Sequence, residues 1–450
     1  MLADSGAEPA RAYDSATPNV DEFFRPCRTP LPRAFRQTRG SPMSARTFAT
    51  LPRTGRRMRY VVPLIAALAA CDSPTNPGAL TPTPPLRALA TPTAYRITDL
   101  GVGRAGDLYS IATAISSNGF IAGLSFVSST SPYHGFVIGG TKHDLGLSEP
   151  YLTVTGVNSS ENVVGSYGPS STATTAFIWT SGHRVVSTLA KLPGASSMAA
   201  VGINDAGQIA GCAVVSGVNH IVMWSGATRT IKDLGTGPAH QGACATAINL
   251  HGMMAVLYAS GGQLAVGMYN QFGVLIPVPL PAGHVTPGDT LSLAIPDGGP
   301  PNGSVPSPSI NRYGDLAVNL SATFMGCTVG GCASGFFLWT GGAGSVLQPP
   351  ESDLNYVTGL NVNHLATVFA VFSRPDAGYC PFPFAYTVAG GYVGLPELPA
   401  ASGVECGFDG NTGFQGDWPL AVNDADVIVG AYDVGNPSSF NFHAVRWTPK

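Results

Sequence analysis

The chain has 450 residues, of which 56 are glycine, 38 are proline and only 11% are charged. This length suits several small domains or one large repeat domain, and the 44% hydrophobic content excludes a disordered polar chain. Residues 1–57 hold ten arginines and five acidic residues, whereas residues 72–450 hold 12 basic and 21 acidic residues, a net charge of −9. Because that part lacks a basic patch to neutralise phosphate, we expect no nucleic-acid binding.

Residues 1–57 are rich in Arg and Pro and show no periodicity. They are predicted either to be disordered or to lie upstream of the true translation start, at Met43 or Met58. We favour the misassigned start, because a signal peptide should begin near the N-terminus, whereas this one begins at residue 58. In both cases the segment is left out of the fold argument.

Residues 58–71 have the pattern of a signal peptide. Three arginines, at positions 56, 57 and 59, precede the apolar run Tyr60 to Ala70, which is too short to span a bilayer. The run ends in Leu-Ala-Ala-Cys, which resembles a bacterial lipobox, and this resemblance implies a diacylglycerol on the thiol of Cys71. The alternative is a buried apolar helix that contains a cysteine. Residues 72–93, dominated by Pro and Thr, are predicted to form an extended tether.

From residue 94 onward, one short phrase returns seven times: a small residue, an aliphatic residue, usually Asn, a turn, and then an aliphatic strand. Such a period predicts a repeat architecture. The third position of the phrase falls at Ser116, Asn158, Asn204, Asn249, Asn311, Asn361 and Asn423.

A second motif follows most copies, as in His443-Ala-Val-Arg-Trp447, and a strand ending in Asp-Leu-Gly comes after it. Four short strands in each unit of 42–62 residues predict an all-β fold, a β-propeller of seven blades with about four antiparallel strands each. The domain begins with a final-strand phrase, Tyr95 to Gly101, and the seventh unit lacks that strand. The N-terminal strand is therefore expected to complete the last blade and close the ring over residues 94–450.

These motifs resemble the bacterial extracellular HAF-repeat family over about residues 95–450. The second motif is carried best by His443 to Trp447, and the first by Asn204 to Gly207. The fourth copy departs at Tyr269 and the sixth at Tyr386, where other copies have Trp. The resemblance implies a propeller-like exported protein but no activity.

Most recurring polar residues have a structural interpretation. The Asn is expected to cap a tight turn rather than to read a ligand, since Asn bonds its own backbone there. The Asn-Asp-Ala stretches at 204 and 423 lack the acids and the terminal Glu of a calcium loop. His134, His220 and His443 occupy equivalent places in different blades and are expected to bond a neighbouring strand. Blade-to-blade packing is expected of four tryptophans at one strand position: Trp179, Trp224, Trp339 and Trp447.

Outside the doubtful N-terminal segment and Cys71, six cysteines remain, and an even number in an exported protein predicts disulfides. Sequential pairing is the most economical of the fifteen possible arrangements: Cys212–Cys244, Cys327–Cys332 and Cys380–Cys406.

Two insertions interrupt the repeat, at residues 277–308 and 394–419. Long loops on a propeller carry binding residues, so the second insertion is the best candidate for a ligand site. Its candidate residues are Phe408, Phe414, Asp417 and Trp418.

No serine nucleophile motif, phosphate loop or zinc motif is present, and we predict no catalytic residue, metal or cofactor. The sequence predicts a monomeric, lipid-anchored binding or scaffold module at the cell envelope, with an unidentified protein or carbohydrate ligand. The alternative is a propeller enzyme acting on glycans, a hydrolase or lyase, with acids converging from several blades.

Overall fold

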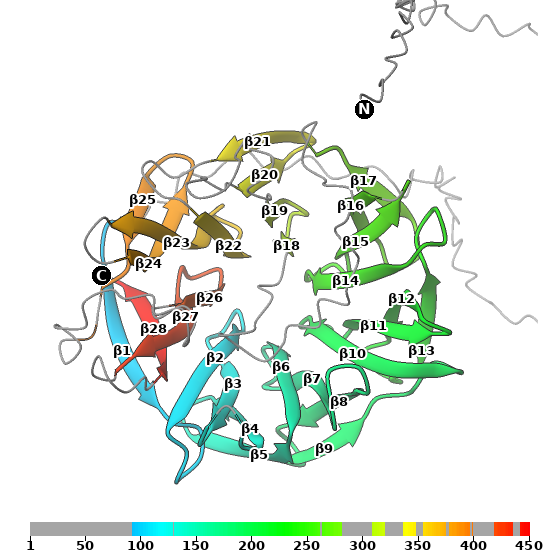
Figure 1. Cartoon of the computed structure of the whole chain (residues 1–450), viewed down its shortest axis with the longest axis horizontal. Coiled ribbons are helices and arrows are strands. Elements are labelled where there is room, and N and C mark those ends of the chain that lie inside the picture. The colour runs from blue at the N-terminus through cyan, green and yellow to red at the C-terminus, as the bar shows by residue number, and fades with distance from the viewer. Residues whose placement is uncertain are drawn as a thin grey trace, which may run out of the picture. The chain divides into compact units, whose positions relative to one another are not determined.

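Seven four-stranded antiparallel sheets surround a central axis in the computed structural model of the chain (Figure 1). The structure describes residues 92–128, 130–261, 263–280, 308–319, 336–347, 354–374, 378–396, 398, 418–434 and 442–450. Most of the strands in the three inner positions of each blade are short apolar runs between Gly, Asn and Ser turns, as the sequence predicted. The prediction of a seven-bladed β-propeller is confirmed. Within these ranges no helix is long and apolar enough to cross a membrane.

The blades are numbered in chain order, and the strands of each are given from the axis outward. Blade 1 has β2 (Tyr109–Ile115), β3 (Ile121–Phe126), β4 (Tyr133–Ile138) and β5 (Lys142–Glu149). Blade 2 has β6 (Tyr151–Val157), β7 (Val163–Gly168), β8 (Thr175–Thr180) and β9 (Val185–Thr188). Blade 3 has β10 (Ala195–Ile203), β11 (Ile209–Val215), β12 (Val218–Trp224) and β13 (Ile231–Gly235). Blade 4 has β14 (Ala243–Ile248), β15 (Met254–Ser260), β16 (Gln263–Tyr269) and β17 (Leu275–Val278).

The remaining blades follow the same order. Blade 5 has β18 (Ser309–Ile310), β19 (Leu316–Asn319), β20 (Phe336–Thr340) and β21 (Ala343–Leu347). Blade 6 has β22 (Leu354–Leu360), β23 (Ala366–Arg374), β24 (Gly378–Thr387) and β25 (Gly391–Gly394). Blade 7 has β26 (Trp418–Val422), β27 (Ile428–Asp433), β28 (Phe442–Pro449) and, outermost, β1 (Tyr95–Gly101).

The N-terminal strand closes the ring. This was predicted, because the domain begins with a final-strand phrase and the seventh unit lacks that strand. Strand β1 pairs antiparallel with β28, from Tyr95 opposite Pro449 to Gly101 opposite Ala444. Next to the pair of Tyr95 and Pro449, the backbone N–H of Lys450 donates to the carbonyl of Ala94 at 3.1 Å. The first and last strands of the domain therefore share one sheet, which leaves no unfinished edge in blade 7.

The inner strands carry a β-bulge three residues before the repeated Asn, in every blade except blade 5. Where the bulged residue is Thr, its hydroxyl reaches the neighbouring inner strand: Thr155 donates to Ala200 O at 2.9 Å and Thr246 to Pro308 O at 2.7 Å. The next residue is small in every copy, because inner strands come close there. A Cβ atom on Gly156 would lie 3.0 Å from the backbone N of Ile203.

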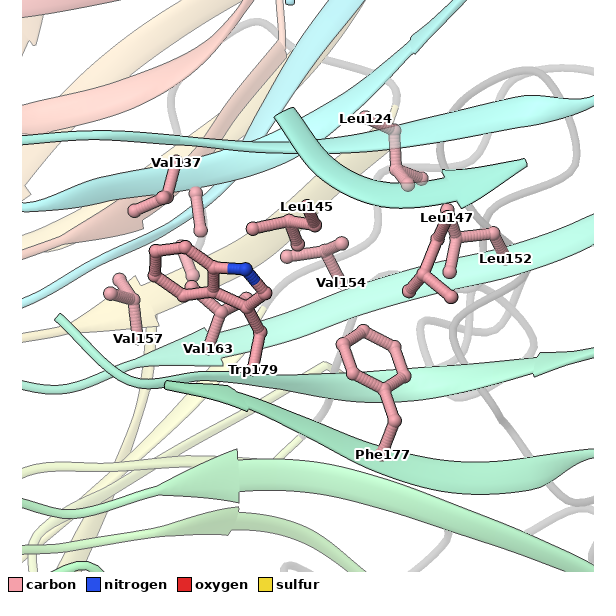
Figure 2. Packing of buried hydrophobic residues seen from close by; sticks show 12 residues of the cluster. Leu124, Val137, Leu145, Leu147, Leu152, Val154, Val157, Val163, Phe177 and Trp179 are labelled. Carbon is pink, nitrogen blue, oxygen red and sulfur yellow. The ribbon is translucent and has the colours of Figure 1, made fainter. Parts of the chain in front are cut away.

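The hydrophobic core lies between blades. Trp179 of blade 2 packs with Val137 and Leu145 of blade 1 in one buried cluster (Figure 2). The indole N–H of Trp224 donates to Ala190 O of the preceding blade at 2.8 Å, and that of Trp447 to Pro396 O at 3.0 Å. These contacts confirm the packing role predicted for the tryptophans.

The degenerate fourth copy keeps the same position filled with an aromatic ring. Tyr269 ends β16 and is 5% exposed, in a cluster with Ala243 and Met254. In blade 5, Trp339 is only half-buried.

Candidate functional site

The repeated Asn organises a tight turn where each inner strand ends. The backbone N–H of Asn204 donates to Gln208 O at 3.0 Å, and its side-chain Oδ1 accepts from the backbone N–H of Gln208 at 2.9 Å. The fourth residue of the turn, Gly207, has φ of 75°. Glycine suits this left-handed conformation, which explains the Asn-x-x-Gly pattern. The predicted turn-capping role is confirmed.

The same asparagines also join the blades, which the sequence did not predict. Each side-chain Nδ2 donates to the backbone carbonyl of the equivalent residue in the following blade, so the bonds run in a ring around the axis. The donor–acceptor distances are Asn158 to Asn204 3.1 Å, Asn204 to Asn249 3.0 Å, Asn249 to Asn311 3.1 Å, Asn311 to Asn361 3.1 Å, Asn361 to Asn423 2.9 Å and Asn423 to Ser116 3.1 Å.

Blade 1 has Ser116 in place of Asn. There, one residue makes the bond within the turn and another makes the bond to the next blade. The Ser116 hydroxyl accepts from the backbone N–H of Phe120 at 2.9 Å, which is the local bond of the turn. Asn118 donates its Nδ2 to Ser159 O of blade 2 at 2.9 Å, which is the bond between blades. The hydrogen-bonded ring is therefore complete in all seven blades despite the substitution.

A cavity of about 190 Å³ opens inside this ring, on the axis of the propeller. Its wall includes the residue just before the Asn position in every blade, and all seven are aliphatic: Ile115, Val157, Ile203, Ile248, Ile310, Leu360 and Val422. Each projects from the end of an inner strand toward the axis. The interior of the cavity is thus an apolar collar to which every blade contributes one side chain.

Five residues that follow the Asn position line the cavity entrance, and we call them the rim: Ser117, Asp205, Leu250, Arg312 and Asp424. Arg312 Nη2 lies 2.5 Å from Asp424 Oδ2. Asp205 instead accepts from the backbone N–H of Ser159 at 2.8 Å and from the Ser117 hydroxyl at 3.1 Å. Among the described residues it forms no salt bridge, so the rim keeps one negative charge that no cation neutralises.

A buried hydrogen bond between His364 and Asp315 supports the turns beside the cavity. His364 occupies the left-handed turn position of blade 6 with φ of 55°, where four other copies have Gly. Its Nε2 lies 2.7 Å from Asp315 Oδ2 of blade 5, and Asp315 also accepts from Asn311 Nδ2 at 3.0 Å. The contact between blades compensates for a backbone conformation that His rarely adopts.

The predicted histidines have structural partners in blades 3 and 7. His220 Nδ1 lies 3.0 Å from Asp233 Oδ2, and His443 Nδ1 lies 2.9 Å from Asp99 Oδ2. Both aspartates belong to the Asp-Leu-Gly phrase of the adjacent outer strand. The expected bond to a neighbouring strand is confirmed for these two residues. It is also confirmed for His134, whose Nε2 lies 3.2 Å from Ser148 Oγ on β5, while its Nδ1 contacts Asp107 in the segment before β2.

One predicted disulfide is present. Cys212 on β11 is bonded to Cys244 on β14, with Cα atoms 5.2 Å apart, and it joins blade 3 to blade 4. Cys327, Cys332 and Cys406 lie outside the described residues, as does the side chain of Cys380. The lipidation candidate Cys71 also lies outside them.

The structure describes one of the four ligand candidates in the second insertion. Phe408, Phe414 and Asp417 lie outside the described residues, and only Trp418 lies within them. Trp418 begins β26 and is 6% exposed, with its ring centroid 4.7 Å from that of Phe442. Its side chain is thus part of the core and offers little surface to a ligand.

The described ranges contain no group of three His, Cys, Asp or Glu side chains that could hold a metal ion. All seven blades contribute residues to the cavity, so we take the cavity and its rim as the candidate site, which the sequence had not singled out. The repeat does contain a signal for this site. The residue before Asn is aliphatic in every copy, whereas the residue after Asn varies in charge and size.

The sequence matches no protein-family model and no curated protein. Solved structures with a similar fold include TolB from Acinetobacter baumannii, 12% identical over 64% of this chain, with a TM-score of 0.38. An oligogalacturonate lyase from Vibrio parahaemolyticus is 9% identical over 79% of this chain and 97% of its own, with a TM-score of 0.47. A prolyl endopeptidase is 15% identical over 64% of this chain, with a TM-score of 0.43. The chain spans 63% of that TolB and 43% of that endopeptidase, and the likeness concerns the fold alone.

Proposed function

We propose that this chain is an exported, lipid-anchored propeller that acts as a binding module at the bacterial cell envelope. Its ligand site would be the axial cavity with the rim of Ser117, Asp205, Leu250, Arg312 and Asp424. Export and anchoring are supported by the signal-peptide pattern, by the lipobox resemblance at Cys71 and by the resemblance to the HAF-repeat family.

The observation that carries the binding role is the contrast between two adjacent positions of the repeat. The position before Asn is aliphatic in all seven blades, as a structural collar requires. The position after Asn changes from Ser to Asp, Leu and Arg, although all copies share one backbone turn. A pocket with an apolar interior and a few polar groups at its entrance is the usual form of a small-ligand site.

The rim also indicates the chemistry of the ligand. Asp205 is exposed and its carboxylate is held by a hydroxyl and a backbone N–H rather than by a cation. The ligand would insert a small apolar group into the collar and place a positive charge or a hydrogen-bond donor at Asp205. Suitable ligands are a peptide side chain or an amino sugar of the envelope.

The alternative of a glycan hydrolase or lyase has less support. A glycoside hydrolase requires two acids free to act on one bond. On the rim, Asp424 is already paired with Arg312, which leaves Asp205 as the one rim acid without a cationic partner. We therefore propose binding without bond cleavage at this site.

The binding role can be tested by screening the purified protein against arrays of peptides and envelope oligosaccharides. Leu250→Lys places a positive charge at the cavity entrance, where Leu250 is 40% exposed, and this charge would repel a cationic ligand and compete with it for Asp205. Val388→Lys, at a 59% exposed position in the turn between β24 and β25, is the matched control. Ligands retained by the wild type should lose at least roughly tenfold in affinity with Leu250→Lys, about 1.4 kcal/mol, and nothing with Val388→Lys. Equal effects of the two variants would refute the cavity as the site.

The anchor needs a separate test. Expression of the full chain in a bacterium supplied with radioactive palmitate should label the protein, and Cys71→Ser should abolish the label and release the protein from the membrane fraction. A Cys71→Ser protein that is still labelled would disprove acylation at this residue.

A further inference from the structure

A serine, a histidine and a buried aspartate form a hydrogen-bonded chain in blade 1. Ser148 Oγ on β5 lies 3.2 Å from His134 Nε2 on β4. His134 Nδ1 lies 3.1 Å from both carboxylate oxygens of Asp107. The two ring nitrogens of one histidine thus contact a hydroxyl on one side and an acid on the other, which is the arrangement of a nucleophile, a base and an orienting acid.

The other copies of the repeat show that the fold does not require this arrangement. In blades 3 and 7 the equivalent histidines bond the aspartate of the Asp-Leu-Gly phrase. In blade 1 the aspartate of this phrase is Asp144, and its Oδ2 lies 3.7 Å from Arg104 Nε instead. Where blade 1 has Ser148, four residues after the aspartate, the other two blades have Gly237 and Gly103. Both the acid and the hydroxyl are therefore particular to blade 1.

The acid is held firmly in place. Asp107 is 7% exposed, and its backbone N–H donates to Arg104 O at 3.2 Å in a turn before β2. The Ser125 hydroxyl donates to its Oδ2 at 2.5 Å. A fixed carboxylate at Nδ1 favours the tautomer with the proton on that nitrogen, which leaves Nε2 free to accept the proton of Ser148.

The nucleophile is accessible, and the same end of blade 1 exposes apolar side chains. Ser148 is exposed, at the end of the blade opposite to the axial cavity. At the same end, Leu108 next to Asp107 is 53% exposed and Val127 is 43% exposed. Phe126 stacks on Tyr109 with ring centroids 5.1 Å apart. These side chains give this end of blade 1 apolar surface for an acyl group.

We propose that Ser148, His134 and Asp107 form an acyl-transfer site that hydrolyses esters of small apolar acids. Ser148 Oγ attacks the ester carbonyl carbon while its proton passes to His134 Nε2. The bond to the alcohol oxygen breaks, and the alcohol leaves with that proton. Water then attacks the acyl-serine and gives a proton to His134, and His134 passes this proton to Ser148 Oγ as the bond between the acyl carbon and Ser148 Oγ breaks and the carboxylic acid leaves. Asp107 is a positioning residue for His134.

The test uses the full chain with p-nitrophenyl butyrate as substrate and with a fluorophosphonate probe, whose phosphorus bonds to a reactive serine oxygen as fluoride leaves. Ser148→Ala should abolish labelling and turnover. His134→Ala should lower turnover on the order of 10²-fold, the usual contribution of a general base, and added imidazole should restore part of it. Asp107→Asn should lower kcat with KM unchanged. His220→Gln, in blade 3, is the matched control and should leave turnover unchanged.

Circular dichroism and thermal melting of each variant separate lost chemistry from lost folding. Labelling that persists in a folded Ser148→Ala protein, or turnover equal in wild type and Ser148→Ala, would overturn the proposal. The outcome is independent of the axial cavity, because Leu250→Lys should bind the cavity ligand more weakly yet keep its reactivity toward the probe.

Discussion

Asn423 donates its side-chain amide to the backbone carbonyl of Ser116 at 3.1 Å, across 307 positions of the sequence. This bond joins blade 7 to blade 1 near the axis. Strands β1 and β28 join the two ends of the propeller domain within blade 7. The ring is thus closed twice, once by a strand and once by an asparagine. One repeated residue therefore shapes each turn, connects the blades and surrounds the axial cavity.

The ring of asparagines can be tested within blade 4, which contains a matched control. Asn249 is 5% exposed; it accepts from two backbone N–H groups of its turn and donates to Asn311 O at 3.1 Å. Asn270 caps a similar turn through the N–H groups of Phe272 and Val274, and among the described residues it forms no side-chain bond to another blade. Asn249→Ala should lower the free energy of unfolding by about 2–3 kcal/mol and Asn270→Ala by about 1 kcal/mol.

Urea unfolding followed by tryptophan fluorescence provides both values. If the two substitutions cost the same, the bonds between blades add nothing to stability, and the asparagines serve only their own turns.

Tyr95 should make the protein sensitive to alkali. Its side chain is 2% exposed, and its hydroxyl has no hydrogen-bond partner among the described residues. Burial, and secondarily the charge of Asp426, raises the pKa of Tyr95 far above its usual value. The folded state therefore favours the neutral phenol, and this contribution is complete below the unfolded pKa of about 10 and is lost as the pH rises above it.

Tyr95→Phe removes the titrating group and an unpaired buried hydroxyl. At pH 8 the variant should be as stable as the wild type or about 1 kcal/mol more stable. Above about pH 10 it should lose stability less steeply. Urea midpoints measured at pH 8 and pH 11 test both statements, and parallel losses in the two proteins would show that Tyr95 does not titrate on unfolding.

The disulfide between Cys212 and Cys244 should stabilise the junction of blades 3 and 4. The bonded residues are 32 positions apart, and the chain-entropy estimate for such a loop is about 3–4 kcal/mol. Replacing both cysteines by Ala should lower the unfolding free energy by about that amount. Non-reducing peptide mapping tests this pair together with the predicted pairs Cys327–Cys332 and Cys380–Cys406. Free thiols in protein isolated from the envelope would contradict the pairing.

The fold could be predicted because each blade repeats the same local signals. The Asn turn, the Trp strand and the Asp-Leu-Gly strand recur in one order, and the phrase at Tyr95 reveals the offset of the ends. The small residue before each aliphatic residue, such as Gly156, is explained by the close approach of neighbouring inner strands.

The site could not be predicted in the same way, because lateral neighbours in a ring are far apart in sequence. Arg312 and Asp424 form a pair across 112 positions, and no local pattern connects them. Trp418 was expected to be exposed in a loop, yet it lies at the start of a strand against Phe442. Asp107 belongs to no repeated motif, so its contact with His134 had no sequence signal at all.

The central claim, that the axial cavity binds the ligand, is tested most directly by methyl NMR. Four of the seven collar residues are isoleucines: Ile115, Ile203, Ile248 and Ile310. In protein with labelled isoleucine methyl groups, a ligand identified on the arrays should shift these four signals. The signals of Ile111 and Ile221, both 0% exposed within blades 1 and 3, should stay in place. Binding that leaves all four collar signals unchanged would contradict the proposed site.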